Sequence, residues 1–116
     1  LFGGANADRV EGGTGQDTLS GGSGEDVFVF TSVNDSPHGA TRDVITDFAD
    51  GVDMIDLSGL ATGLSFVGAS FTGGTGEVRY NGAIGRLYVD LDGDQASDFS
   101  VDITGAPIID ASDLIL

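Results

Sequence analysis

Three consecutive nine-residue segments decide the fold of this chain: Gly3-Gly4-Ala5-Asn6-Ala7-Asp8-Arg9-Val10-Glu11, then Gly12-Gly13-Thr14-Gly15-Gln16-Asp17-Thr18-Leu19-Ser20, then Gly21-Gly22-Ser23-Gly24-Glu25-Asp26-Val27-Phe28-Val29. They share the pattern Gly-Gly-x-Gly-x-Asp-x-apolar-x, which is broken only where Asn6 replaces a glycine. Asparagine tolerates a left-handed backbone better than most residues, so the change is mild. A flexible acidic linker would not keep both the aspartate and the apolar residue in phase. The pattern therefore predicts a repeated turn and strand.

The first six residues of each repeat predict a turn that binds calcium. Its backbone must visit positive φ, which glycine does at low cost. Such a turn directs several carbonyl oxygens toward one point, and the aspartate adds a hard anionic oxygen. Calcium takes about six to eight oxygen ligands, so one turn supplies only half a site.

The last three residues of each repeat predict a short strand with its central apolar side chain pointing inward. Those side chains are Val10, Leu19 and Phe28. Two repeats should make one full coil, so that the turn of Asp8 lies over the turn of Asp26 with an ion between them.

Asp17 should lie on the opposite edge of the coil, where it needs another partner. Counting nine residues on from Asp26 reaches Asp35, although the glycines have ended by then. The other candidates for closing that site are Asp43, Asp47 and Asp50.

The composition favours a small, cation-binding domain. The chain has 116 residues, enough for one domain, with 20 glycines and 40% hydrophobic residues. Nineteen acidic residues against four arginines give a net charge of −15, which repels nucleic acid and anionic membranes. There is no cysteine, so in a secreted protein a bound metal such as calcium, rather than disulfides, would stabilise the fold.

The N-terminal end indicates a piece of a longer protein. Leu1 and Phe2 fit the last positions of a preceding repeat, and there is no initiator Met. Neither a signal peptide nor an apolar run of membrane-spanning length is present in the sequence. We expect an upstream domain.

Later segments predict further strands and no ordinary helix. Asn81-Gly82 is a hairpin signal between alternating segments. The expected strands cover residues 27–31, 43–48, 52–57, 77–80, 84–90 and 98–103. We therefore predict an all-β fold: a right-handed parallel β-roll in residues 1–30, capped by a mostly antiparallel, sandwich-like sheet in residues 31–116, the two forming one continuous domain.

A second acidic segment has two interpretations. Residues 90–98 place acids at positions 1, 3, 5 and 9 of an EF-hand-like loop: Asp90, Asp92, Asp94 and Asp98. Gln95 stands where that loop demands glycine, and Val101 stands where it demands a bidentate glutamate. The segment is either a weak calcium site or a solvated acidic turn.

Catalytic residues are not indicated. His38 is the only histidine, and one histidine does not make a zinc site by itself. The His-Glu-x-x-His pattern of zinc proteases is absent from the sequence, and the serines have no neighbouring base. We expect no enzymatic activity from this chain.

Residues 12–30, together with Asp43-Val-Ile-Thr-Asp-Phe and Asp53-Met-Ile-Asp-Leu-Ser-Gly-Leu60, resemble the C-terminal domain of serralysin-type RTX proteases. The resemblance covers essentially the whole chain. It implies a calcium-filled β-roll and a secreted parent protein, such as a zinc metalloprotease, exported by the type I machinery of a Gram-negative bacterium. It also implies that Asp113, Leu114, Ile115 and Leu116 form an uncleaved secretion signal.

The same resemblance places the calcium ligands on the turns. One ion would be held by Gly3, Ala5 and Asp8 with Gly22, Gly24 and Asp26. The full set of candidate metal-site residues is Gly3, Gly4, Ala5, Asn6, Asp8, Gly12, Gly13, Thr14, Gly15, Asp17, Gly21, Gly22, Ser23, Gly24 and Asp26, extended by Asp35, Asp43, Asp90, Asp92, Asp94 and Asp98. We expect a monomer.

Related domains include the R-modules of bacterial mannuronan epimerases, and this leaves a second functional hypothesis. The chain would then bind or help to modify an acidic, alginate-like polysaccharide. Tyr80 and Tyr88 would form a sugar platform if they lay together on an exposed face. Four scattered arginines and no lysine argue against a basic groove for such a ligand.

Overall fold

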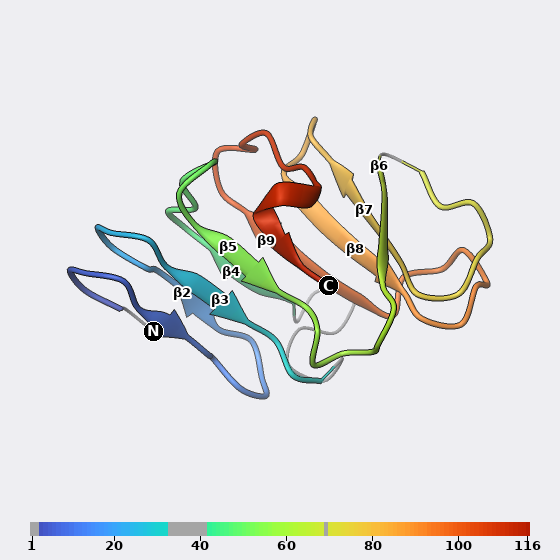
Figure 1. Ribbon diagram of the computed structural model, residues 1–116, viewed down its shortest axis with the longest axis horizontal. Helices are drawn as coiled ribbons and strands as arrows, with labels where there is room; N and C mark the ends of the chain where they lie inside the picture. The colour runs from blue at the N-terminus through green and yellow to red at the C-terminus, as the bar shows by residue number, and fades with distance from the viewer. Residues whose placement is uncertain (1–2, 33–41, 69) are drawn as a thin grey trace.

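The computed structural model describes residues 3–32, 42–68 and 70–116 and consists of two layers of β-strands (Figure 1). The first sheet has the strand order β1-β3-β5-β10, and all its pairings are parallel. Its strands are Arg9–Val10 (β1), Val27–Val29 (β3), Met54–Asp56 (β5) and Leu114–Ile115 (β10).

The second sheet combines a parallel part with an antiparallel extension, in the order β2-β4-β9-β8-β7-β6. The pairs β2–β4 and β4–β9 are parallel, β9–β8 and β8–β7 are antiparallel, and the edge strand β6 pairs in parallel with β7. Its strands are Thr18–Leu19 (β2), Asp43–Ile45 (β4), Ser65–Gly68 (β6), Glu77–Asn81 (β7), Arg86–Asp90 (β8) and Phe99–Ile103 (β9). The predicted all-β class, with a parallel roll and a mostly antiparallel cap, is confirmed.

From β1 to β5 successive strands alternate between the two sheets, so two repeats make one coil as predicted. Val10 lies in register with Phe28, and Phe28 with Ile55. In the second sheet Leu19 lies in register with Ile45. These five side chains are at most 1% exposed, which places the apolar residue of each repeat in the core.

Parallel pairing continues beyond residue 30, where the sequence suggested a change of architecture. Both β4 and β5 extend the roll, and the chain returns to it after the antiparallel excursion. Ile103 in β9 lies in register with Ile45, and Leu114 in β10 with Ile55. The reason is that apolar residues outside the glycine repeats still meet the inward positions of the coil.

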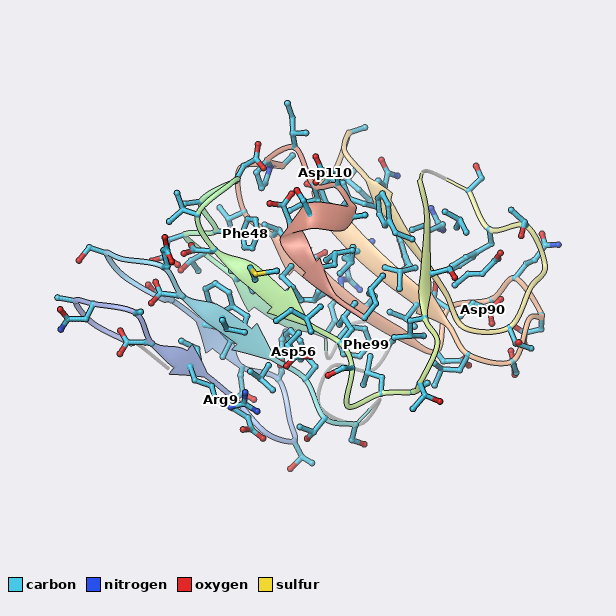
Figure 2. All side chains as sticks on the ribbon, in the orientation of Figure 1. Arg9, Phe48, Asp56, Asp90, Phe99 and Asp110 are labelled. Atoms are coloured by element: carbon cyan, nitrogen blue, oxygen red, sulfur yellow. The ribbon has the colours of Figure 1, made fainter. Side chains whose placement is uncertain are left out.

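Aromatic side chains fill the space between the layers (Figure 2). Phe30 meets Phe99 edge-on with a centroid separation of 5.0 Å, and Phe28 packs at 6.2 Å from Phe48. The Asn81-Gly82 hairpin is also confirmed, since Asn81 in β7 pairs with Arg86 in β8. The only helical turn in the described residues is a 3-10 turn, Ala111–Asp113 (η2).

Close stacking of turns explains why glycine is needed at Gly22. Its φ is +83°, and a Cβ there would overlap the carbonyl oxygen of Gly4 in the turn beneath. Gly13 has a similar φ of +75°, but a Cβ there would meet nothing within 4 Å. Asn6 itself adopts φ +86°, the left-handed conformation expected of it.

This contrast gives a matched test of the stacking. Both Gly22→Ala and Gly13→Ala should lose about 1–2 kcal/mol to left-handed strain. Gly22→Ala should lose about 1–3 kcal/mol more, because the added methyl group forces the two turns apart. Urea unfolding of the two variants at one saturating calcium concentration measures the difference, and equal losses would contradict the stacked geometry.

Asp102 joins the antiparallel extension to the roll. Its two carboxylate oxygens pair with Nε of Arg42, which precedes β4, at 2.9 Å and with Nε of Arg86 in β8 at 2.6 Å. Partial burial raises the pKa of Asp102, but the hydrogen bonds from Arg86 and Arg42 outweigh burial and lower it overall.

The lowered pKa predicts a stabilising contribution that disappears in acid. A depressed folded-state pKa means that the contribution is complete above the unfolded value of about 3.9 and is lost as the pH falls through the folded value. At neutral pH we expect Asp102→Asn to cost about 0.5–1 kcal/mol, since both ion pairs are partly exposed. Unfolding of wild type and variant from pH 7 to pH 3 in saturating calcium should show this difference shrinking. A constant difference would contradict it.

Candidate metal-binding turns

The turns that precede β1 and β3 stack on one edge of the roll. The amide of Asp8 donates to Oδ1 of Asp26 at 3.0 Å, and the amide of Val27 donates to the carbonyl of Asp8 at 2.9 Å. The amide of Ser23 donates to the carbonyl of Gly4 at 3.2 Å. The turn of Asp8 therefore lies on the turn of Asp26, as the repeat period predicted.

The column continues to a third turn, which the repeat pattern does not reveal. Before β5, Asp53 accepts from the amide of Asp26 at 2.9 Å through Oδ1 and from the amide of Ala49 at 2.9 Å through Oδ2. Burial raises the pKa of Asp53, and these two hydrogen bonds offset only part of that rise. The repeat pattern does not predict this role because the turn 46–53 lacks the glycine pattern, although Asp53 does occupy the position just before its strand.

Asp17 lies on the opposite edge, and its partner is Asp43. The amide of Asp17 donates to Oδ1 of Asp43 at 2.7 Å, and the two residues stand one step before Thr18 and Val44, which pair in register. Of the alternatives considered for this position, Asp35 lies outside the described residues.

Asp47 and Asp50 belong to the first edge, so they do not close the Asp17 site. Asp47 accepts from the hydroxyl of Ser20 at 2.7 Å and from the amides of Gly21 and Gly22 at 2.9 and 2.8 Å. Burial alone would raise the pKa of Asp47, but the bonds from Ser20, Gly22 and Gly21 lower it. Asp47 lies only two residues after Ile45, the inward-pointing residue of β4. It therefore falls in the turn on the other side of the coil.

Each repeat aspartate buries one carboxylate oxygen without a hydrogen-bond partner. The Oδ2 atoms of Asp8, Asp17 and Asp26 are buried and have no hydrogen-bond partner. Each lies over the first glycine of its own turn: Cβ atoms built on Gly3 and Gly12 would stand 3.0 and 2.8 Å from these oxygens. An anionic oxygen left bare in this way is unfavourable unless a cation neutralises it.

The chemistry of the turns fits calcium. Their available ligands are carboxylate oxygens and backbone carbonyls, with no cysteine or histidine in residues 3–26. Hard oxygen ligands in a flexible turn suit calcium better than zinc or copper. The predicted residues Gly3 to Asp8, Gly12 to Asp17 and Gly21 to Asp26 are thus gathered on two edges with buried anionic oxygens.

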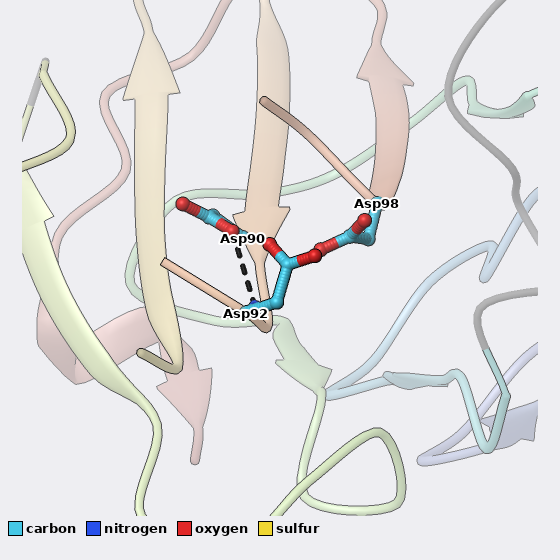
Figure 3. A group of neighbouring side chains, drawn as sticks. All are labelled: Asp90, Asp92 and Asp98. Carbon is cyan, nitrogen blue, oxygen red and sulfur yellow. Dashed lines mark hydrogen bonds between the residues drawn. The ribbon is translucent and has the colours of Figure 1, made fainter. Parts of the chain in front are cut away.

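The second acidic segment forms a compact loop between β8 and β9 (Figure 3). Carboxylate oxygens of Asp90, Asp92 and Asp98 lie within 4.8 Å of one another. Asp90 is fully buried and accepts from the amides of Asp92, Gly93 and Gln95 at 3.2, 3.0 and 2.8 Å. Burial opposes ionisation, but these bonds lower the pKa of Asp90.

Internal hydrogen bonds thus account for the shape of this loop. Oδ2 of Asp98 accepts from the amide of Leu91 at 2.9 Å, and Oδ1 of Asp94 accepts from the amide of Ala96 at 2.9 Å. Asp94 is exposed and is not one of the three carboxylates whose oxygens converge. Gln95 takes a left-handed φ of +64°, where an EF-hand would have glycine. Calcium binding by this loop stays a prediction.

Tyr80 and Tyr88 do not form a common platform. They occupy adjacent pairs of the β7–β8 ladder and so face opposite sides of the sheet, and each is only 7% exposed. The Tyr80 hydroxyl donates to the carbonyl of Pro107 at 2.6 Å, while the Arg79 guanidinium lies 3.9 Å above the Tyr88 ring. No pocket is found in the part of the chain that the structure describes.

The predicted signal residues are built into the fold. Asp113 ends the 3-10 turn and is 2% exposed, and Leu114 is 6% exposed. Leu114 and Ile115 form β10 at the edge of the first sheet, whereas Leu116 is 36% exposed. Within residues 3–32, 42–68 and 70–116 we find no helix with the length and apolar character that a membrane crossing requires.

Comparison with known proteins identifies the architecture. Residues 4–116 match the family model described as peptidase M10 serralysin C terminal. Serralysin A of Dickeya chrysanthemi is 47% identical over 84 residues, which are 67% of this chain and 17% of that protein. Metallopeptidase AprA of Pseudomonas marginalis is 43% identical over 94 residues, or 76% of this chain and 19% of that protein. The chain thus spans under a fifth of the length of these relatives.

A solved structure shares the fold along nearly the whole chain. It is the solution structure of the AlgE6R3 subunit from the Azotobacter vinelandii mannuronan C5-epimerase, with a TM-score of 0.68 and 34% sequence identity. The alignment covers 99% of this chain and 66% of that structure.

Proposed function

We propose that this chain, which belongs to the peptidase M10 serralysin C-terminal family, is a non-catalytic module that folds when it binds extracellular calcium. In this proposal the module stabilises an upstream domain of its parent exoprotein and carries the parent's type I secretion signal. The ions bind between stacked turns: one between the turns of Asp8 and Asp26, and another at Asp17 and Asp43.

The observation that carries the proposal is the set of buried, unpartnered oxygens on Asp8, Asp17 and Asp26. Without a cation these oxygens oppose folding, and the net charge of −15 adds general repulsion. With calcium they become ligands, so that binding free energy is gained only by the folded chain.

The expected magnitude is sufficient to control folding. If each site binds like other extracellular calcium modules, with a Kd of about 10⁻⁴ M, millimolar calcium adds about 1.4 kcal/mol per site. Two or three such sites supply several kcal/mol, which approaches the whole stability of a small domain. The scarce free calcium of a bacterial cytosol would leave the chain unfolded and fit for export, and extracellular calcium would then fold it.

The test of this function is a calcium titration followed by far-ultraviolet circular dichroism. We expect a cooperative gain of β signal with calcium and none with magnesium, which holds its water more tightly and demands a stricter geometry. A chain that is already fully folded in chelator would refute the proposal.

A pair of variants assigns the effect to the stacked turns. Asp26→Asn keeps an oxygen that can accept from the amide of Asp8 but removes the anionic ligand. We expect it to raise the calcium midpoint about tenfold, equivalent to about 1.4 kcal/mol. Glu25→Gln removes the same charge from an exposed neighbour and should leave the midpoint close to wild type. Equal shifts in the two variants would mean that net charge alone sets the response.

The likeness to an epimerase R-module supports a second candidate, an acidic-polysaccharide-binding module. Its weak point is that three of the four arginines are already engaged, Arg42 and Arg86 with Asp102 and Arg79 with aromatic rings, while the exposed Arg9 lies apart from them on β1. We expect no saturable heat of binding when alginate oligosaccharides are titrated into the calcium-loaded chain. Saturable binding would favour this candidate.

A further inference from the structure

The loop that joins β7 to β8 requires glycine at one end only (Figure 1). The carbonyl of Asn81 accepts from the amide of Gly85 at 2.9 Å, and Gly85 has a left-handed φ of +71°. A Cβ at Gly85 would stand 2.4 Å from the carbonyl oxygen of Ile103. Gly82 is exposed and not left-handed, and a Cβ there would make an ordinary contact at 3.7 Å from the Tyr80 ring. The fold therefore does not require the glycine that follows Asn81.

A glycine in that position has a chemical consequence. Its unhindered backbone nitrogen can attack the side-chain carbonyl carbon of the preceding residue and close a succinimide ring. The chain has three pairs in which an acid or its amide precedes glycine: Asp50-Gly51, Asn81-Gly82 and Asp92-Gly93. The amide of Gly51 donates to Asp113 at 3.2 Å, and the amide of Gly93 donates to Asp90 at 3.0 Å. In the part of the chain that the structure describes, the amide of Gly82 has no acceptor, so its nitrogen is available.

The side chain of Asn81 is held in a way that favours this attack. Its Oδ1 accepts from the amide of Ala83 at 3.0 Å. When a nitrogen adds to Cγ of Asn81, negative charge develops on Oδ1, where that donor already lies. A donor placed in advance at a developing oxyanion lowers the barrier of the reaction. Gly82 and Ala83 are exposed, so water also reaches the site.

We propose that Asn81 is a site of spontaneous covalent modification in the folded protein. The Gly82 nitrogen loses its proton to solvent and bonds to Cγ of Asn81. The bond from Cγ to Nδ2 breaks, and ammonia leaves with a proton taken from water. A water molecule then adds to one of the two ring carbonyls and opens the succinimide, which leaves either aspartate or isoaspartate. This inference goes beyond the proposed function and is independent of it, because neither residue is a proposed calcium ligand.

The isoaspartate product changes the main chain as well as the charge. It routes the backbone through the former side chain and so lengthens the loop by one methylene group. The other end of the loop has little room for this change, because the amide of Ile103 in β9 donates to the carbonyl of Gly85 at 2.6 Å. The isoaspartate should therefore loosen the contact between the loop and β9.

Ageing of the calcium-loaded chain tests the proposal. Trypsin cleaves after Arg79 and Arg86 and releases residues 80–86. In that peptide, mass spectrometry detects the replacement of an amide by an acid, and chromatography separates isoaspartate from aspartate. We expect Asn81 to be lost at a rate within about tenfold of that in a synthetic peptide of residues 80–86, with isoaspartate among the products. Asn6, which precedes Ala7, should stay intact over the same period.

A matched variant assigns the reaction to the Gly82 nitrogen. Gly82→Ala should fold as wild type does, because its Cβ fits, but it should slow the loss of Asn81 about tenfold or more. Loss at the wild-type rate, or products without isoaspartate, would indicate direct hydrolysis and overturn the proposal. An Asn81 that stays intact in the folded chain while the peptide reacts would overturn it too. If Gly82→Ala does not fold, Asn81→Gln must show the same slowing at position 81, because its longer side chain closes a ring less readily.

The structural consequence has its own control in Asn81→Asp, which carries the new charge on an ordinary backbone. We expect the amide of Ile103 to exchange with deuterium about tenfold faster in the isoaspartate form than in this variant. Equal exchange in the two forms would contradict the loosening by the added methylene group. A chain that shows no calcium response but still loses Asn81 would refute the proposed function and leave this modification standing.

Discussion

The structure depends on how each repeat aspartate places its backbone amide and its carboxylate oxygens. In each repeat the aspartate donates its backbone amide to the carboxylate of an aspartate on the next coil, and it buries its own Oδ2 where no donor reaches it. This is seen at Asp8, Asp17 and Asp26. Hydrogen bonds alone can therefore hold the coils together, but they cannot neutralise the buried carboxylate oxygens. No arginine bonds to these buried oxygens: Arg42 and Arg86 pair with Asp102, Arg79 lies against aromatic rings and Arg9 is exposed. A cation from outside the chain is what the proposed function supplies at this point.

The antiparallel extension ends the acidic column on the second edge. Asp17 and Asp43 stand one coil apart, and the residue in register with Asp43 on the next strand is Val101. An apolar residue at that point cannot continue a metal site, but it can cover the end of the stack. Repeat proteins need such an atypical terminal unit, and here β9 pairs in parallel with β4 on one side and antiparallel with β8 on the other. The second sheet therefore has a coil of the roll, β2, at one edge and the short strand β6 of the extension at the other.

Local periodicity explains what could be predicted from the sequence. The repeats predicted the inward side chains Val10, Leu19 and Phe28 and the stacking of alternate turns, because both follow from a strict period of nine. The Asn81-Gly82 signal predicted its hairpin for an equally local reason. Asp43 stood among the candidates for Asp17 but could not be chosen, because loop length after Phe30 is free to vary.

The non-local pairings could not be predicted. Ile103 returns to lie beside Ile45, and Leu114 beside Ile55, after a long excursion through the antiparallel strands. No turn signal specifies which distant strand a β-strand will join, and the apolar spacing of either segment suits several partners. The role of Asp53 was hidden for a related reason, since its turn keeps the aspartate before the strand but has lost the glycines around it.

The first edge of the roll consequently changes character along its length. At the N-terminal end the turns of Asp8 and Asp26 carry bare oxygens, and farther along Asp53 has both oxygens hydrogen-bonded within its own surroundings. The last turn is closed by the reciprocal pair Asp110 and Asp113, with no glycine repeat at all. Demand for an external cation thus falls from the repeats toward the C-terminal turn, whereas hydrogen bonding within the chain rises. Because each turn donates to the carboxylate of the next, hydrogen bonds tie the cation-dependent end of this edge to the self-sufficient end, and the whole edge folds as one connected column.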